Sequence, residues 1–283
     1  MNILVIHSHN ANRGDEAAVK AMVDELLIKY PGAKITISNN GFTPYPGMPE
    51  NVIQIDRFPK LESRIAQLEF FIVLLFKGKF ALTKEARKFI RALKEADVVL
   101  HAPGGPSIGD TYFKAEKLYL WRLNLIRRMG IPYIFYAPSM GPFNCASRNK
   151  LRKEVISGAE RIILRDPISV KYVKDFLPGV EVEQALDSAL QHDIDIDKNE
   201  RKYNNYPELK NFIENHEKCI GITITDLKWH PVHKNEKIIE QIPTAFKAFI
   251  TQKVKEGYGV IFIPQLYGNL NDTKVMNDYM LDS

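Results

Sequence analysis

The chain has 283 residues, of which 45% are hydrophobic and 26% are charged. This balance is typical of a globular domain protein and excludes a disordered chain, a collagen-like repeat and a polytopic membrane protein. At roughly 150 residues per domain, the length predicts two domains. The longest apolar run, Phe70–Phe76, is far short of the roughly 20 residues that span a bilayer. Since the N-terminus has no signal-peptide pattern and two cysteines are too few for a disulfide framework, we expect a cytoplasmic location.

The net charge of +5 is concentrated in one region of the chain. Between Arg57 and Gly130, Lys and Arg outnumber Asp and Glu by 15 to 7. Such an excess favours anionic partners. Within it, residues 84–94 combine a basic face with an apolar stripe at helical spacing. This pattern indicates either a core-facing helix with a solvated basic face or a helix that makes a peripheral contact with an anionic membrane. Nucleic acid is not an expected partner, because no recognised binding module is present.

Short apolar runs alternate with longer helical patterns, which predicts an α/β fold with an open parallel sheet covered on both faces. The predicted strands are 3–7, 34–38, 52–55, 98–101, 133–136, 161–164 and 180–182. The predicted helical segments are 14–30, 61–96, 113–129, 148–157 and 168–176. We assign residues 1–190 to this N-terminal Rossmann-like domain.

Residues 191–207 are polar and weakly periodic, and we interpret them as a linker. The C-terminal α/β domain, 208–283, has predicted strands at 219–225 and 260–263 and a helix at 237–255. We expect this second domain to be incomplete in the given chain, because so few residues supply only about two strands.

Loops that follow the predicted strands carry glycines and charged residues, and ligands bind at this edge of parallel sheets. Asn12, Gly14 and Asp15 open the first helix, where backbone N–H groups attract an anion. The alternative is that they only cap the helix. Gly104 and Gly105 follow a later strand and allow a backbone to approach a ligand closely, unless they form a plain tight turn.

Further candidates lie along the same predicted edge. Gly141 follows the strand 133–136, and Arg165 leaves the strand 161–164. A strand-end arginine suits bidentate capture of a carboxylate or phosphate, although a surface pair with Asp166 is the alternative. Asp110 and Asp187 supply carboxylates after two other strands.

The second domain offers His230 and Gln265 in loops that follow its two predicted strands. A single histidine can act as a general acid or base, although a surface loop with two histidines is the alternative. His230 and His233 lack an evident third ligand, so no metal site is expected.

The order of these loops resembles the polysaccharide pyruvyl transferase family. The resemblance is carried by NRGDEA, PGGPSIGD, SMGPF, RDPIS, LDSAL and IFIPQLYG, from Asn2 to about Asp272. It implies two Rossmann-like domains in a GT-B-like arrangement. It also implies a transferase that moves the enolpyruvyl group of phosphoenolpyruvate onto a sugar of a cell-surface polysaccharide, such as a capsule or exopolysaccharide, or onto its precursor. The product is a pyruvate ketal. In one departure, Pro106 stands where the family often has a third glycine.

This chemistry needs cations and helix N-termini for the phosphate and carboxylate of the donor. Arg165, Gly104, Gly105 and the Asn12–Asp15 turn are the implied binding groups. It also needs a proton donor, a base for the sugar hydroxyl and a carboxylate near an oxocarbenium-like centre. For these roles the candidates are the catalytic set Asp15, Asp110, Asp187 and His230. Their assignment as acid or base stays open.

The expected partners are phosphoenolpyruvate and a glycan or lipid-linked saccharide acceptor. Neither a metal nor an organic cofactor is expected, because an arginine and backbone amides can neutralise the leaving phosphate. The main alternative is a GT-B glycosyltransferase that uses a nucleotide sugar. A non-catalytic module that binds glycans or a membrane is the other alternative.

Overall fold

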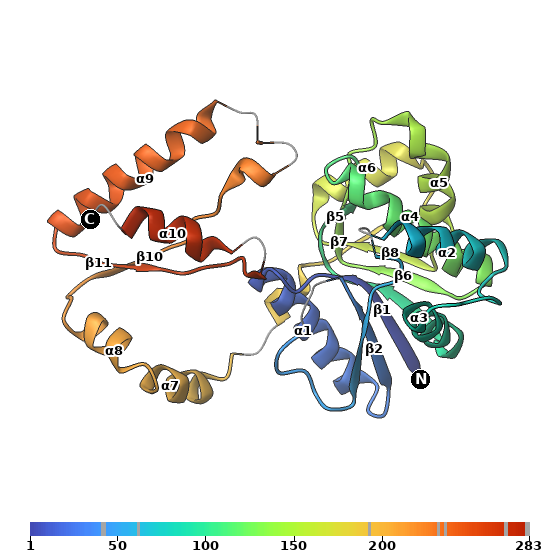
Figure 1. Cartoon of the computed structure of the whole chain (residues 1–283), viewed down its shortest axis with the longest axis horizontal. Coiled ribbons are helices and arrows are strands. Elements are labelled where there is room, and N and C mark those ends of the chain that lie inside the picture. The colour runs from blue at the N-terminus through green and yellow to red at the C-terminus, as the bar shows by residue number, and fades with distance from the viewer. Residues whose placement is uncertain are drawn as a thin grey trace. The chain divides into compact units, whose positions relative to one another are not determined.

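The structure is a computed structural model that describes residues 1–40, 44–60, 63–191, 194–230, 233–234, 237–268 and 271–280. The chain divides into two compact units, Met1–His192 and Asp193–Ser283. Figure 1 shows the helices and strands of each unit.

A parallel sheet of seven strands organises the first unit (Figure 1). The order is β3-β2-β1-β4-β6-β8-β9, and all neighbouring strands are parallel. Their bounds are β1 Asn2–Ser8, β2 Lys34–Asn39, β3 Val52–Asp56, β4 Val98–His101, β6 Tyr133–Tyr136, β8 Arg161–Leu164 and β9 Glu183–Gln184. Because the chain moves outward in opposite directions from β1 and β4, the ends of these two strands form a topological switch point.

Helices cover the two faces of this sheet unequally. The face formed by Leu4, Ile6 and alternate residues of the later strands packs in the larger core cluster with five helices. These helices are α2 Arg64–Leu75, α3 Lys84–Glu95, α4 Phe113–Met129, α5 Asn149–Ser157 and α6 Pro167–Phe176. On the opposite face, Ile3 and Val5 pack against α1, Arg13–Lys29.

A second, two-stranded parallel sheet lies where the sequence predicts only loops. It pairs β5, Gly104–Ile108, with β7, Pro138–Met140. These strands follow the carboxyl ends of β4 and β6, so the small sheet joins the two glycine-containing loops at the switch point. The pattern was not recognisable in the sequence because glycine and proline are depleted in ordinary strands.

The final strand of the first unit also differs from the prediction. The expected strand 180–182 does not pair, and β9 begins at Glu183. Val180 and Val182 pack against the main core instead. Their apolar character therefore reflects burial and not a place in the sheet ladder.

The second unit contains a two-stranded parallel sheet, β10 Cys219–Ile222 and β11 Gly259–Phe262. The strands are joined through α9, Ile238–Lys255, and a small core contains Ile222, Ile224, Ile250 and Met276. The other helices are α7 Ile196–Asn204, α8 Pro207–Glu214 and α10 Asp272–Met280. The segment 191–207, interpreted as a linker from the sequence, thus contains α7.

Candidate active site

The candidate loops of the first unit leave one edge of the sheet. Asp15 follows β1, Gly104 follows β4, Gly141 follows β6 and Arg165 follows β8. Since these strands are parallel neighbours, their carboxyl ends share one edge. This shared placement, expected from the sequence, is confirmed by the sheet topology, and it is the edge at which ligands of such sheets bind.

Asp15 and Gly104 meet at the switch point. A Cβ atom on Gly104 would lie 3.0 Å from Oδ1 of Asp15, and Gly104 has a φ of +138°. Both the space and the backbone conformation therefore require glycine at this position. At Gly105, no atom of the described residues lies within 4 Å of the Cβ position, so this side of the backbone is open.

Asn12 holds the first turn of α1 in place. Its side-chain oxygen accepts hydrogen bonds from the backbone N–H groups of Gly14, at 2.7 Å, and Asp15, at 3.4 Å. This is the arrangement of a helix N-cap. The cap fixes the backbone that carries the Asp15 carboxyl group.

Arg165 and Asp187 form an ion pair at the same edge. Nη1 of Arg165 lies 2.5 Å from Oδ2 of Asp187, and Nε donates to the hydroxyl of Ser139 at 2.9 Å. Ser139 in turn donates to Asp166, the N-cap of α6, at 2.8 Å. Arg165 therefore pairs with Asp187 and not with Asp166. Its remaining nitrogen, Nη2, has no hydrogen-bond partner within the described part of the chain.

The electrostatic environment favours the protonated form of Asp15. Burial raises the pKa of Asp15 to about 6, the positive charge of Arg165 partly opposes this shift, and the negative charge of Asp187 adds to it. A carboxyl group with such a pKa holds its proton closer to neutral pH than an ordinary aspartic acid. Asp15 is therefore suited to donate a proton.

A hollow of about 360 Å³ adjoins this charged group. Tyr136, Ala137, Ile163 and the segment 185–191 line it, and Asp187 is the one candidate residue among the described residues of this lining. That segment is held against α1, because the hydroxyl of Ser188 donates to the carbonyl of Ala18 at 2.9 Å. The volume lies within the range of small-molecule sites.

Asp110 has a different environment from the other carboxylates. Its Oδ1 accepts from Nη2 of the buried Arg152 at 2.7 Å, and its Oδ2 accepts from the backbone N–H groups of Asn144 and Cys145. Arg152 also forms a two-bond pair with the buried Glu116, at 2.7 and 2.9 Å. These contacts make Asp110 part of the network that fixes the loop after β5.

Gly141 is buried by protein atoms. A Cβ at this position would lie 2.7 Å from the ring of Tyr172, and the carbonyl of Gly141 lies 2.6 Å from the Cβ position of Gly109. The glycine is therefore explained by the close approach of two loops. Of the candidate glycines, Gly105 has open space beside its backbone, whereas Gly104 and Gly141 are closed in by Asp15 and Tyr172.

A buried group of His7, His101 and Tyr119 lies below the switch point and was missed by the sequence analysis. The ring centroids of His7 lie 4.7 Å from His101 and 4.5 Å from Tyr119. His7 has a φ of +60°, a conformation that is uncommon outside glycine. Nε2 of His101 lies 2.7 Å from the hydroxyl of Ser107, while neither nitrogen of His7 has a hydrogen-bond partner among the described residues.

Burial lowers the pKa of all three histidines near this group. The pKa of His101 falls to about 4, and so does the pKa of His9, which approaches Tyr119 with an Nε2–hydroxyl distance of 3.0 Å. The pKa of His7 is also lowered, mainly by burial and then by the charges of His101 and Arg122. The histidines are therefore neutral at physiological pH.

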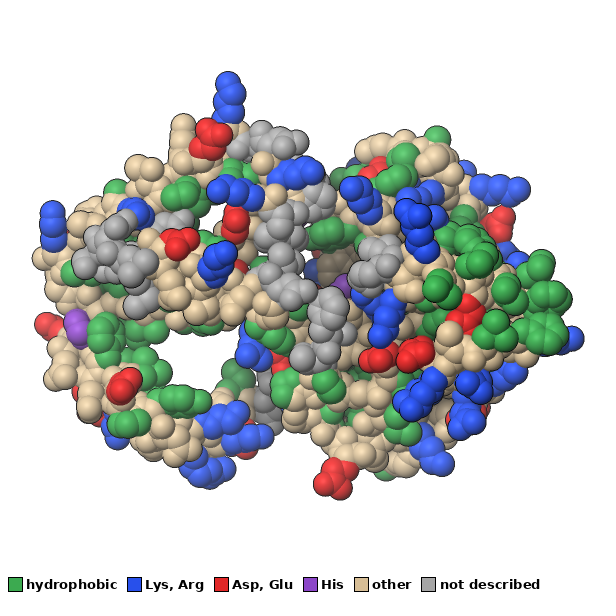
Figure 2. All heavy atoms as spheres, viewed as in Figure 1, with side chains coloured by type: hydrophobic (Ala, Val, Ile, Leu, Met, Phe, Trp, Pro, Cys, Tyr) green, Lys and Arg blue, Asp and Glu red, His purple; other side chains and the backbone are tan. Residues whose placement is uncertain are grey.

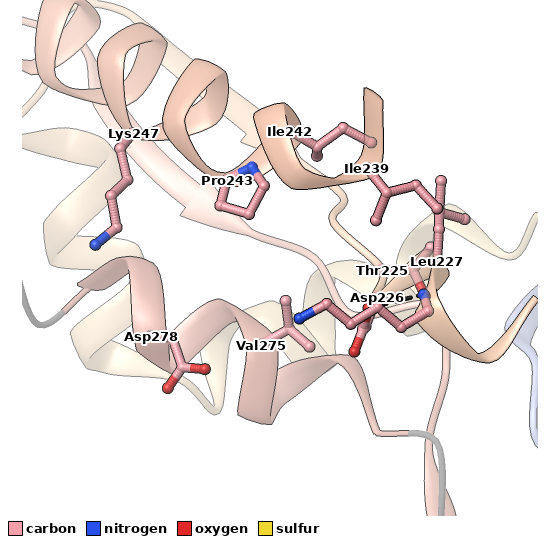
Figure 3. A pocket seen from close by; sticks show the side chains of 10 residues that line it. Thr225, Asp226, Leu227, Ile239, Ile242, Pro243, Lys247, Val275 and Asp278 are labelled. Atoms are coloured by element: carbon pink, nitrogen blue, oxygen red, sulfur yellow. Dashed lines mark hydrogen bonds between the residues drawn. The ribbon is translucent and has the colours of Figure 1, made fainter. Parts of the chain in front are cut away.

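In the second unit, a hollow of about 260 Å³ lies where the chain leaves β10 (Figure 3). Asp226 and Lys228 from the segment after β10, Lys247 from α9 and Asp278 from α10 line it. The sequence candidates of this unit lie outside it. His230 stacks on His233 with a centroid distance of 4.6 Å, and the backbone N–H of Gln265 donates to the buried Asp272 at 2.9 Å.

Two features are absent from the residues that the structure describes. No helix there is both long enough and apolar enough to cross a membrane. No group of three or more His, Cys, Asp or Glu side chains there could hold a metal ion.

The fold and the candidate site define an α/β protein of the Rossmann type, with an arginine, two carboxylates and an open glycine loop at the carboxyl edge of its sheet. The chain belongs to the polysaccharide pyruvyl transferase family, whose model matches residues 12–281. Membership of this family of transferases, expected from the sequence, is thereby confirmed. Among curated proteins, none matches the chain in sequence.

The fold is also similar to that of a solved protein from Listeria monocytogenes assigned as a UDP-N-acetylglucosamine 2-epimerase. The two chains are 12% identical with a TM-score of 0.51, and the match covers 99% of this chain. It covers 65% of the other, so this chain spans about two thirds of the length of that protein. The GT-B-like fold class expected from the sequence, with Rossmann-like α/β domains, is confirmed.

Proposed function

We propose that this protein transfers the enolpyruvyl group of phosphoenolpyruvate to a sugar of a cell-surface polysaccharide or its precursor. Two sugar hydroxyls add to the central carbon of the donor, the methylene group gains a proton and becomes a methyl group, and phosphate leaves with the second proton. The product is a pyruvate ketal. The observation that carries the proposal is the placement of Asp15, Gly104, Arg165 and Asp187 at one sheet edge in a chain of this family.

Arg165 supplies the positive charge for the donor. Its guanidinium is held in position by Ser139 and Asp187, and Nη2 is directed to none of the described residues. A held guanidinium binds a carboxylate or phosphate with little further loss of side-chain entropy. The open backbone at Gly105 allows the donor to approach the main chain closely, whereas the N–H groups of Gly14 and Asp15 already donate to the side chain of Asn12.

We assign the proton donor as Asp15. Its raised pKa of about 6 provides the protonated carboxyl group that the methylene carbon requires. We assign Asp187, which lines the hollow and pairs with Arg165, as the carboxylate that stabilises the positive centre. His230 stays our prediction for the base that accepts a hydroxyl proton, and Gln265 for a contact with substrate.

We also propose that the transfer takes place in the cytoplasm, where phosphoenolpyruvate is produced. The acceptor in this proposal is a glycan or a lipid-linked saccharide, and the linkage is a ketal across two of its hydroxyls.

The test measures binding of phosphoenolpyruvate by titration calorimetry and release of phosphate with a glycan acceptor. Arg165→Ala should weaken phosphoenolpyruvate binding by roughly ten- to a hundredfold, the usual effect of losing a charge-assisted contact. Arg161→Ala is the matched control, because Arg161 lies at the amino end of the same strand and also pairs with a carboxylate, Glu183. Its effect on binding should be small.

Two results would contradict the proposal. The first is equal phosphoenolpyruvate affinity for the wild type and the Arg165→Ala variant. The second is binding of a nucleotide sugar such as UDP-N-acetylglucosamine in place of phosphoenolpyruvate, which would favour a glycosyltransferase.

A further inference from the structure

Helix α2 and the turn after it expose many large apolar side chains on the flank of the first unit. On α2 they recur every three or four residues and therefore share one face of the helix. Their exposed fractions run from 46% to 78%, and they are Ile65, Leu68, Phe71 and Leu75. The turn adds Phe76, Phe80 and Leu82, between 43% and 68% exposed. We call these seven side chains the α2 patch. Figure 2 shows hydrophobic side chains gathered over this region, with Lys and Arg around them.

The α2 patch is held on a well-packed helix. The opposite face of α2 places Phe70 and Val73 in the main core, both fully buried. The buried carboxylate of Glu69 accepts hydrogen bonds from the backbone N–H groups of Leu82 and Thr83, at 2.6 and 2.7 Å. These bonds fasten the turn to α2. Because α2 is apolar on its outer face as well as on its core face, we expect the outer face to contact a second apolar environment.

Basic side chains surround the α2 patch. Lys77 and Lys79 lie within the turn, and the exposed face of α3 adds Lys84, Lys88 and Arg91. Among the described residues, none of these five forms an ion pair with a carboxylate. The sequence left open whether α3 itself lies on a membrane. In the structure its apolar stripe of Ala86, Phe89, Ile90 and Leu93 is buried in the core, so α3 contributes only its charges.

We propose that the α2 patch docks this protein onto the surface of an anionic lipid bilayer. The apolar side chains of α2 enter the boundary between headgroups and acyl chains, and the surrounding cations lie against the lipid phosphates. Apolar area and electrostatic attraction add in this kind of interfacial binding. A second copy of the chain is the less suitable occupant, because a symmetric contact would place two sets of unpaired cations opposite each other.

Helix α3, which supplies cations beside the α2 patch, also indicates where the candidate site lies. The last turn of α3 adjoins the amino end of β1, where Asn2 donates to Asp97 at 2.7 Å and to the carbonyl of Glu95 at 2.8 Å. The first turn of α3, which begins at Lys84, is therefore directed toward the carboxyl edge of the sheet. A docked protein would hold that edge close to a lipid-linked acceptor. This last step rests on the proposed function, whereas the docking itself does not.

The experiment is co-sedimentation of the full chain with two kinds of vesicle, one of phosphatidylcholine and one with phosphatidylglycerol added. The wild type should bind the anionic vesicles and leave the neutral ones largely unbound. Ile65→Gln, Leu68→Gln and Leu75→Gln together should lower the partition coefficient at least tenfold. Lys84→Gln, Lys88→Gln and Arg91→Gln together should lower it by roughly two orders of magnitude, the usual effect of three charges at a membrane surface.

Matched controls remove the same numbers of apolar and basic side chains elsewhere. Ile28→Gln, Ile194→Gln and Ile196→Gln change three residues that are 67% to 73% exposed outside the patch. Lys198→Gln, Arg201→Gln and Lys202→Gln remove three charges from α7. Both control proteins should bind anionic vesicles nearly as the wild type does. Melting temperatures of all variants establish that each is folded.

Several results would overturn the proposal. They are absence of vesicle binding by the wild type, equal binding to neutral and anionic vesicles, or a loss of binding in the controls as large as in the patch variants. A further contradicting result would come from sedimentation velocity. If the wild type is a dimer, the apolar patch variant is a monomer and neither binds vesicles, the α2 patch is a protein interface. Because vesicle binding needs neither donor nor acceptor, its failure is distinguishable from failure of the proposed transfer.

Discussion

Asp15, the proposed proton donor, makes the stability of the fold depend on pH. Its pKa of about 6 lies above the ordinary value of 3.8, so the folded protein favours the protonated carboxyl group more than the unfolded chain does. The stability that this provides is complete below pH 3.8 and is lost as the pH rises through 6. Above that pH the ionised carboxylate of Asp15 is a partly buried charge next to Gly104. Arg165 can compensate it only in part, because Arg165 already pairs with Asp187.

The Asp15→Asn variant separates these two effects. At pH 7.5 the amide has no charge to bury, so the melting temperature should equal or exceed that of the wild type. Phosphate release with phosphoenolpyruvate and acceptor should fall at least about a hundredfold, because the proton donor is lost. Both quantities can be measured on one preparation. Glu16→Gln changes the neighbouring carboxylate and should preserve turnover. A fully active Asp15→Asn protein would remove Asp15 from the catalytic set.

The buried histidines predict how stability depends on pH. His9 and His101 have a pKa of about 4 in the folded protein against an ordinary value of 6.5, and the pKa of His7 is lowered as well. The unfolded chain therefore binds more protons as the pH falls below 6.5. Each such histidine should decrease the free energy of unfolding by about 1.4 kcal/mol per pH unit in the window below 6.5. Urea denaturation from pH 7.5 to pH 5 measures this slope.

His7→Phe is the informative variant for this slope. The two ring nitrogens of His7 are buried without hydrogen-bond partners among the described residues. Replacing the imidazole by an apolar ring of similar size therefore removes the cost of burying two polar atoms. The variant should be at least as stable as the wild type at pH 6, with a shallower pH dependence. An unchanged slope for His7→Phe would mean that His7 can be protonated in the folded protein.

At the scale of elements, apolar runs were a reliable guide to the strands and a poor guide to what joins them. The strands 98–101, 133–136 and 161–164 lie where the sequence places them, because each is an apolar run with a buried face. The β5–β7 pair was not predictable, since its glycine and proline content resembles that of a loop. The exposed face of α2 was also not predictable, because the sequence of a helix that is apolar all round does not indicate which face the core covers.

The residues of the candidate site that follow predicted strands were predictable from the sequence. Asp15, Gly104, Arg165 and Asp187 each follow the end of a strand. Because these strands are parallel, the four residues lie at one edge of the sheet. The group around His7 was not predictable, because its contacts depend on tertiary packing. Tyr119 lies in α4, more than 100 residues later in the chain, and the packing of α4 on the sheet brings the two rings together. A pairing of this kind has no local sequence signal.

The network of Arg152 with Glu116 and Asp110 predicts a strong effect on the loop after β5. Arg152 and Glu116 are fully buried, and Glu116 also accepts from the backbone N–H of Gly109 at 2.8 Å. Breaking a buried ion pair typically costs about 3–5 kcal/mol when the remaining charge has no other partner. Without Arg152, the carboxylate of Glu116 keeps its contact with Arg148 at 3.0 Å, so we expect a cost at the lower end of this range, about 3 kcal/mol. Arg152→Met should therefore lower the free energy of unfolding by about this amount in urea denaturation. Arg161→Met, which breaks an exposed pair, should leave it nearly unchanged; equal effects would contradict the interpretation.

At the scale of the whole molecule, the two units differ in the size of their cores. The first unit has two extensive clusters, one on each face of a seven-stranded sheet. The second has a cluster around Ile222, Ile224, Ile250 and Met276 beside a two-stranded sheet. Burial of apolar area is the main favourable contribution to folding. The second unit should consequently have the lower free energy of opening.

Hydrogen exchange followed by mass spectrometry tests this difference and the location of the donor site together. Backbone amides of β10 and β11 should exchange faster than those of β1 and β4, because regions with smaller cores open at lower free energy. Saturating phosphoenolpyruvate should slow exchange in the loops at Asp15 and Gly105, since a ligand that binds only the folded state stabilises it by RT ln(1 + [L]/Kd). The Arg165→Ala variant should lose this protection at the same ligand concentration while keeping the slow exchange of β1 and β4. Protection by phosphoenolpyruvate confined to β10 and β11 would transfer the donor site to the second unit, and uniform exchange across all four strands would mean that the chain unfolds as one cooperative body.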